Sequence, residues 1–91
     1  ILILDEPESA LSPARQIECL KLLHRLDNST ICQVVMATHS PMLMAYPNAR
    51  LLRLTKHALE PVTVEQTDHF RVMREFCQDP RGFVEGAIAG A

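Results

Sequence analysis

Tryptophan is absent from this sequence of 91 residues, and only four side chains are aromatic. Since 47% of the residues are hydrophobic, the core is expected to consist of Leu, Ile, Val and Met side chains. A chain of this length has room for one small domain with a thin core. Neither positive nor negative residues are in large excess, since the formal net charge is −2. A nucleic acid or an effector protein stays open as a partner, but no basic surface indicates one.

Cysteine is sparse, and Cys19, Cys32 and Cys77 form no C-x-x-C pair. The spacing therefore indicates neither a zinc site nor a disulfide framework, and we expect small buried thiols in a reduced, cytoplasmic protein. No signal peptide and no apolar run near 18 residues occur, so we expect no membrane span. The first residue is Ile1, not methionine, and it opens directly into an apolar run. We therefore expect the N-terminal part of the domain to be missing from this chain.

Two apolar runs, Ile1–Leu4 and Ile31–Ala37, predict β-strands. Because the first run does not alternate, we expect it to be covered on both faces, as in a parallel sheet. Between the runs, Ser12 and Pro13 are typical of a helix start, and the apolar spacing predicts a helix to about Leu26. The order strand, helix, strand predicts an α/β fold with parallel strands and a crossover helix.

The two predicted strands end in residues that carry chemistry. Asp5 and Glu6 follow the first strand, and His39 follows the second. Because the carboxyl ends of parallel strands meet at one edge of a sheet, we expect these side chains to lie close together. One carboxylate suits Mg²⁺, usually through water, and the other suits a base that deprotonates a water. No role follows for Glu8, which is expected to be solvated.

The remainder of the chain predicts smaller elements. We expect a short helix over 41–46, a hairpin of strands 51–55 and 62–66, a helix over 69–78 capped by Thr67 or Asp68, and a last helix from Asp79-Pro80 to about Ile88. In the third helix Phe70, Met73 and Phe76 or Cys77 are expected to turn inward.

The motifs resemble those of a known superfamily. Residues 1–7, Ile-Leu-Ile-Leu-Asp-Glu-Pro, look like the Walker B motif of the ABC-ATPases, and His39 looks like their switch histidine. The segment that follows resembles the D-loop of that family and consists of Ser9, Ala10, Leu11 and Ser12. Residues 37–47 are similar to the stand-alone, non-transporter branch of predicted AAA-family ATPases, and residues 67–80 match that branch more loosely. The sequence is thus identified as the C-terminal part of an ABC-type P-loop NTPase domain spanning residues 1–91.

The resemblance implies a role for each matching residue. Asp5 would hold Mg²⁺, Glu6 would be the catalytic base of ATP hydrolysis, and His39 would contact the γ-phosphate. The D-loop residues would face a second subunit in a homodimer that encloses ATP. One departure concerns Ser12, because the family usually has aspartate there. Ser12 also begins the following helix, so communication between two sites is less clearly implied than hydrolysis.

Three further parts of such a domain do not occur in this sequence. No G-x-x-x-x-G-K-[ST] loop, signature loop or glutamine loop is found, and the only glycines are Gly82, Gly86 and Gly90. We therefore expect the isolated chain to bind Mg-ATP weakly and to be inactive by itself. Two alternatives stay open at this point: an inactive truncated remnant or interaction module, and a metal-dependent nuclease that uses Asp5, Glu6 and Glu8 directly.

Overall fold

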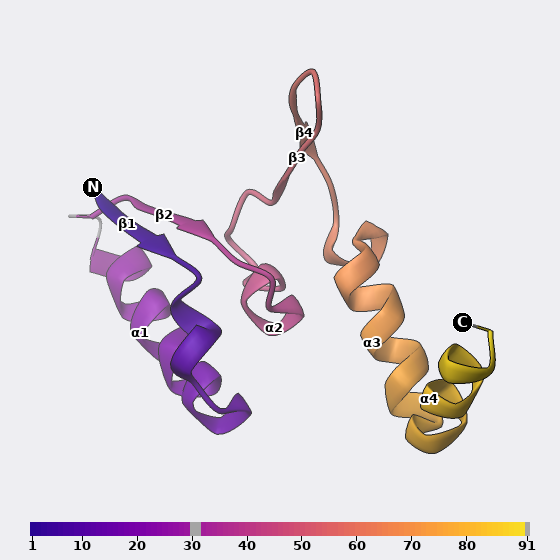
Figure 1. Ribbon diagram of the computed structural model, residues 1–91. Coiled ribbons are helices and arrows are strands. Elements are labelled where there is room, and N and C mark those ends of the chain that lie inside the picture. Colours follow the sequence, from indigo (N-terminus) through magenta and orange to yellow (C-terminus); the bar gives the residue numbers. More distant parts are fainter. Residues whose placement is uncertain (30–31, 91) are drawn as a thin grey trace. The chain divides into compact units, whose positions relative to one another are not determined.

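The computed structural model describes residues 1–29 and 32–90, which divide into two compact units, Ile1–Ala49 and Arg50–Ala91 (Figure 1). Their mixed α/β architecture confirms the predicted fold class, with a small parallel sheet, a crossover helix, a hairpin and C-terminal helices. It is compatible with the C-terminal part of a P-loop NTPase domain. Within the described residues, no helix has the length and apolar character that a membrane crossing requires.

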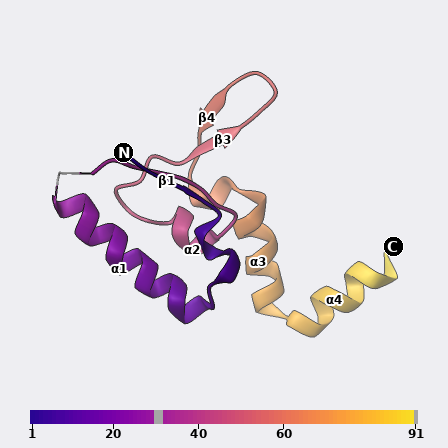
Figure 2. The ribbon, with the colours of Figure 1, turned by 60° about the vertical axis from the view of Figure 1, so that its left-hand side comes forward.

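A parallel pair of strands forms the centre of the first unit. Strand β1 (Leu2–Asp5) pairs with β2 (Val34–Ala37), and the helix α1 (Pro13–Ser29) connects them. Leu2 lies opposite Val34, and Asp5 lies opposite Ala37, so both strands end at the same level. Figure 2 shows α1 running alongside the two strands. The predicted strand–helix–strand unit is confirmed.

Helix α1 begins where the sequence predicts and ends later. The Ser12 hydroxyl accepts a hydrogen bond from the Arg15 amide at 3.3 Å, as a capping residue does. The expected end at Leu26 is wrong, because the helix continues to Ser29. Asn28 and Ser29 make hydrogen bonds within the last turn, whereas Asp27 has partners that the local pattern does not reveal. The carboxylate of Asp27 accepts hydrogen bonds from Tyr46 and Asn48, both at 2.8 Å.

Strand β2 is shorter than predicted. It begins at Val34, while Cys32 and Gln33 are described outside the strand. Ile31, the first residue of the predicted strand, lies outside the described residues. The only described partner of β2 is the four-residue strand β1, and a ladder extends no further than its partner. The apolar run therefore exceeds the paired segment.

The sheet of the first unit has one packed face and one open face. Side chains that point one way, such as Leu4 and Met36, are partly buried, whereas Ile3 is 74% exposed and Val35 51%. The expectation that the first strand is covered on both faces is therefore wrong for this chain. The helices of the unit supply apolar partners for one face, and the buried hydrophobic residues are Leu23 on α1 and Leu43 on α2 (Pro41–Met44).

The second unit begins with a hairpin that is tighter than predicted. Strand β3 (Leu52–Leu54) pairs antiparallel with β4 (Leu59–Pro61). The turn is closed by Thr55, whose amide donates to the Ala58 carbonyl at 2.8 Å and whose hydroxyl accepts from the Ala58 amide at 3.1 Å. The predicted second strand over 62–66 is wrong. Val64–Gln66 is instead a 3-10 helix, stabilised by a hydrogen bond from the Thr63 amide to the Gln66 side chain.

Two helices complete this unit as predicted. Helix α3 (Asp68–Gln78) is capped by the Thr67 hydroxyl, and α4 (Pro80–Ala89) by the Asp79 carboxylate. The rings of Phe76 and Phe83 meet edge to face at 5.9 Å and join the two helices. Of the residues expected to turn inward, Phe70 and Phe76 are partly buried, whereas Met73 is 49% exposed because the ring contact with α4 is made by Phe76.

Candidate functional site

The loops that follow β1 and β2 meet at the carboxyl edge of the small sheet. The Glu6 amide donates to the Ala37 carbonyl at 2.7 Å and extends the ladder by one residue. Glu6 itself adopts a left-handed backbone conformation, with φ 48° and ψ 56°. Such a conformation costs a non-glycine residue about 1–3 kcal/mol and is found preferentially at functional sites. The chain then enters a short 3-10 helix, η1 (Pro7–Ala10).

Two of the predicted site residues lie in direct contact. Oε1 of Glu6 is 3.0 Å from Nε2 of His39, and both side chains are largely exposed to solvent. The sequence-based prediction that these strand ends converge is therefore confirmed for this pair. A carboxylate and an imidazole at this distance on an open edge form an acid–base pair that a ligand in solution reaches directly.

Glu8 differs from its prediction. It was expected to be solvated, yet Oε1 accepts a hydrogen bond from the Thr38 hydroxyl at 2.7 Å, and Oε2 accepts from the His39 amide at 3.0 Å. The side chain is partly buried. One carboxylate on the first loop thus holds two consecutive residues of the second loop. The signal in the sequence was a third acidic residue facing the donor-rich run Thr38-His39-Ser40, but the left-handed turn at Glu6 that brings them together was not readable.

Thr38 and Ser40 extend this network into the helices. The Thr38 hydroxyl accepts from the Ser40 amide at 3.0 Å, and the buried Ser40 hydroxyl donates to Oε1 of Gln16 on α1 at 2.6 Å. The same hydroxyl accepts from the Leu43 amide at 3.3 Å and so caps α2. The second loop is therefore fastened to both helices of the unit. These polar residues were not singled out from the sequence.

Glu8 makes the stability of the chain depend on pH. Partial burial raises the pKa of its carboxyl, but the hydrogen bonds from Thr38 and the His39 amide outweigh this, and the pKa lies below its usual value of 4.5. A carboxylate with a lowered folded-state pKa stabilises the fold above the unfolded-state pKa, and this contribution is lost as the pH falls through the folded-state pKa. We expect the urea midpoint to fall less steeply below pH 4.5 in Glu8→Gln than in the unchanged chain. Glu85→Gln, a change far along the sequence, should keep the original slope.

Asp5 and the predicted D-loop residues flank Glu6 in the sequence. Asp5 ends β1 and is exposed, and its side chain makes no hydrogen bond or ion pair within the part of the chain that the structure describes. Ser9 and Ala10 were predicted as loop and close the 3-10 helix η1, where both are exposed. Leu11 is partly buried, and the hydroxyl of Ser12 is engaged in capping α1, as expected.

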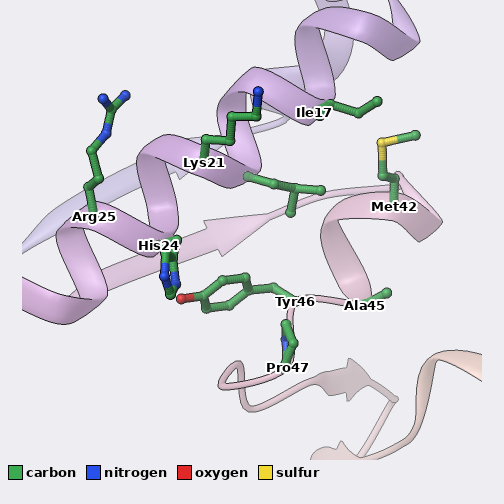
Figure 3. Close-up of a pocket in the computed structure, with 9 residues that line it drawn as sticks. Ile17, Lys21, His24, Arg25, Met42, Ala45, Tyr46 and Pro47 are labelled. Atoms are coloured by element: carbon green, nitrogen blue, oxygen red, sulfur yellow. The ribbon is translucent and has the colours of Figure 1, made fainter.

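A separate hollow lies between α1 and the segment 41–47 (Figure 3). Its volume is about 670 Å³, and none of the predicted site residues lines it. In Figure 3 the Tyr46 ring lies beside His24; its hydroxyl donates to Asp27 at 2.8 Å. The lining is mainly apolar and consists of Ile17, Leu20, Lys21, His24, Arg25, Met42, Ala45, Tyr46 and Pro47. The hollow is therefore distinct from the cluster of Glu6, Glu8 and His39 at the strand ends.

The parallel strand–helix–strand unit makes this an α/β protein, and its carboxylates and histidine lie at the sheet edge where ligands of such proteins bind. Residues 1–45 match the family model described as "AAA domain, putative AbiEii toxin, Type IV TA system". The match supports an AAA-like fragment of a P-loop NTPase in the first unit and, at a general level, nucleotide binding and hydrolysis. No curated protein and no solved structure matches the chain.

Proposed function

We propose that this chain supplies one part of the ATP-hydrolysing site of an ABC-type, stand-alone ATPase. The observation that carries the proposal is the contact of Glu6 with His39, at 3.0 Å, across the ends of two parallel strands. Ligands of open α/β sheets bind at such edges, and phosphoryl transfer needs groups that orient a water and that stabilise charge on the γ-phosphate. The match of residues 1–45 to an AAA domain supports the same chemistry.

In this proposal the two contacting residues divide the reaction between them. Glu6 orients and deprotonates the attacking water, because its carboxylate is exposed and directly follows the end of β1. His39 donates a hydrogen bond to the γ-phosphate and stabilises the charge that develops there. The pairing of the two side chains brings the water and the phosphate to one place.

Asp5 fits the part of a Mg²⁺ ligand. Its carboxylate is exposed at the end of β1 and makes no described hydrogen bond or ion pair, so its oxygens are available. Mg²⁺ in nucleotide sites uses one or two carboxylates, with waters and phosphate oxygens as the remaining ligands. Bound there, Mg²⁺ would neutralise phosphate charge. The proposed substrate and cofactor are therefore ATP and Mg²⁺.

The exposed Ser9 and Ala10 are proposed to face a second subunit in an ATP-dependent homodimer, together with Leu11 and Ser12. The capping bond of Ser12 to the Arg15 amide stabilises α1. The Ser12 side chain is thus engaged by its own helix, and coupling between the two ATP sites of a dimer would depend on Ser9, Ala10 and Leu11.

The nuclease alternative is less well supported by the contacts at this edge. Two-metal hydrolysis needs several carboxylates free to bind metal. Glu6 contacts His39, and Glu8 is bound to Thr38 and the His39 amide, which leaves Asp5. The other alternative, an interaction module without turnover, is supported by the exposed apolar face around Ile3 and Val35. A turnover measurement separates it from the ATPase.

Activity should require a phosphate-binding loop from outside these residues, because the sequence contains no G-x-x-x-x-G-K-[ST]. By titration calorimetry, the isolated chain is expected to show no micromolar binding of Mg-ATP. A longer encoded protein that contains this segment together with such a loop is expected to bind and hydrolyse it. Micromolar binding by the chain alone would contradict the division of the site, and absence of turnover in the longer protein would contradict the proposed function.

A further inference from the structure

We propose that Glu8 is a positioning residue, which holds the backbone of the Thr38–His39 loop so that the His39 side chain meets Glu6. Both oxygens of Glu8 are used, one by the Thr38 hydroxyl at 2.7 Å and one by the His39 amide at 3.0 Å. Neither the family match nor the motif resemblance assigns a role to this residue. The effect of Glu8 on catalysis rests on the proposed function, but its effect on the position of the His39 backbone can be tested without a nucleotide.

The two acidic side chains of the first loop hold the same histidine in different ways. Glu6 contacts the imidazole, whereas Glu8 contacts the backbone amide of the same residue. The proposed reaction requires the Glu6 carboxylate to turn toward a water, and its contact with the imidazole is then given up. Glu8 keeps the His39 backbone in place during that step, because its bonds do not involve Glu6.

A carboxylate is the group that this position needs. Two donors, a hydroxyl and an amide, approach two separate oxygens, and hydrogen bonds to a charged acceptor are about twice as strong as neutral ones. Gln offers a single acceptor oxygen and no charge, and Ala offers none. The hold is extended through Thr38 to the Ser40 amide, and the Ser40 hydroxyl continues it to Gln16 on α1.

The first test measures hydrogen exchange of the His39 amide by NMR in the 91-residue chain without nucleotide. In Glu8→Ala we expect this amide to exchange about 10- to 100-fold faster, the range that corresponds to one bond to a charged group. Glu8→Gln should accelerate it to a smaller extent. The Phe70 amide, which is bonded to the Thr67 hydroxyl at 3.2 Å, is the internal control and should not change. Glu85→Ala is the control variant.

Each result of this test decides the structural part. Unchanged exchange at His39 in a folded Glu8→Ala chain overturns the proposal. If Glu8→Ala unfolds, seen as faster exchange at the buried Leu23 on α1 as well, Glu8→Gln decides instead. In that case the proposal stands when His39 accelerates and Leu23 does not, and it is overturned when His39 keeps its original rate.

The second test concerns turnover and uses the longer protein that contains a phosphate-binding loop. Glu8→Ala is expected to lower kcat about 10- to 100-fold with KM nearly unchanged, because a reacting group displaced by about 1 Å loses rate on that scale. Glu8→Gln should restore part of kcat. If kcat were equal in Glu8→Ala and the unchanged protein while His39 exchange was altered, Glu8 would hold the His39 backbone but would not contribute to catalysis. No turnover in the unchanged protein would count against the ATPase, while the exchange result would still decide what Glu8 holds.

Discussion

Replacing Glu6 with Gln is expected to lower ATP turnover by about 10²–10⁴-fold while ATP binding is retained. The change keeps the size and the exposed position of the side chain at the end of the β1 ladder, but the amide cannot accept a proton from water. Binding is expected to persist because the proposed Mg²⁺ ligand is Asp5, and Glu6 is proposed to act on the attacking water and not on the nucleotide's phosphates. The measurement compares steady-state phosphate release with nucleotide binding in the longer protein.

Glu85→Gln is the matched control for this experiment. It makes the same chemical change on helix α4, in the second compact unit, and should leave turnover unchanged. If Glu6→Gln retained more than about a tenth of the original turnover, Glu6 would not be the base. Loss of nucleotide binding in the same variant would instead assign Glu6 to the binding of Mg-ATP.

The largest effect on stability is expected from Leu43→Ala. Leu43 is 4% exposed, and only it and Leu23 are buried hydrophobic residues within the described chain. Removing a buried leucine side chain costs about 2–5 kcal/mol. A compact unit the size of Ile1–Ala49 is stabilised by only about 2–7 kcal/mol in total. Most of the first unit should therefore unfold, and with it the Glu6–His39 contact.

Far-UV circular dichroism during urea denaturation measures this effect, since the chain has no tryptophan for fluorescence. Leu22→Ala is the matched control, because Leu22 lies next to the buried Leu23 on α1 but is 49% exposed. It should cost less than about 1 kcal/mol. Similar losses in the two variants would mean that the first unit is not organised around the α1–α2 contact.

The elements of the first unit were predictable because each has a local cause. The apolar runs, the Ser12-Pro13 helix start and the right order of elements predict the parallel pair, and the pair in turn predicts that Glu6 and His39 converge. The end of α1 was not predictable in the same way. Asp27 is bound by Tyr46 and Asn48, which lie some twenty residues further along the chain, and such contacts override local helix-ending signals.

The hairpin and Glu8 show two other limits. Because the turn closes at Thr55, β4 begins earlier in the sequence than predicted. The Thr63–Gln66 hydrogen bond favours a 3-10 helix where β-branched residues predict a strand. Glu8 was missed because its partners depend on one backbone angle, the φ of 48° at Glu6. The glutamate at position 6 does not indicate this left-handed conformation, because glutamate rarely adopts it.

The hydrogen bonds of Glu8 also couple the site to the folding of the chain. They join residues 30 and 31 positions apart, across the whole crossover helix. Bringing such distant segments together costs chain entropy before any contact repays it, so these bonds form only when the β1–α1–β2 unit closes. A partly folded chain would hold Glu6 and His39 on separate, unconnected segments. The Glu6–His39 pair therefore forms in the same folding step as the parallel pairing of β1 and β2. Its presence indicates that the strand–helix–strand unit has folded.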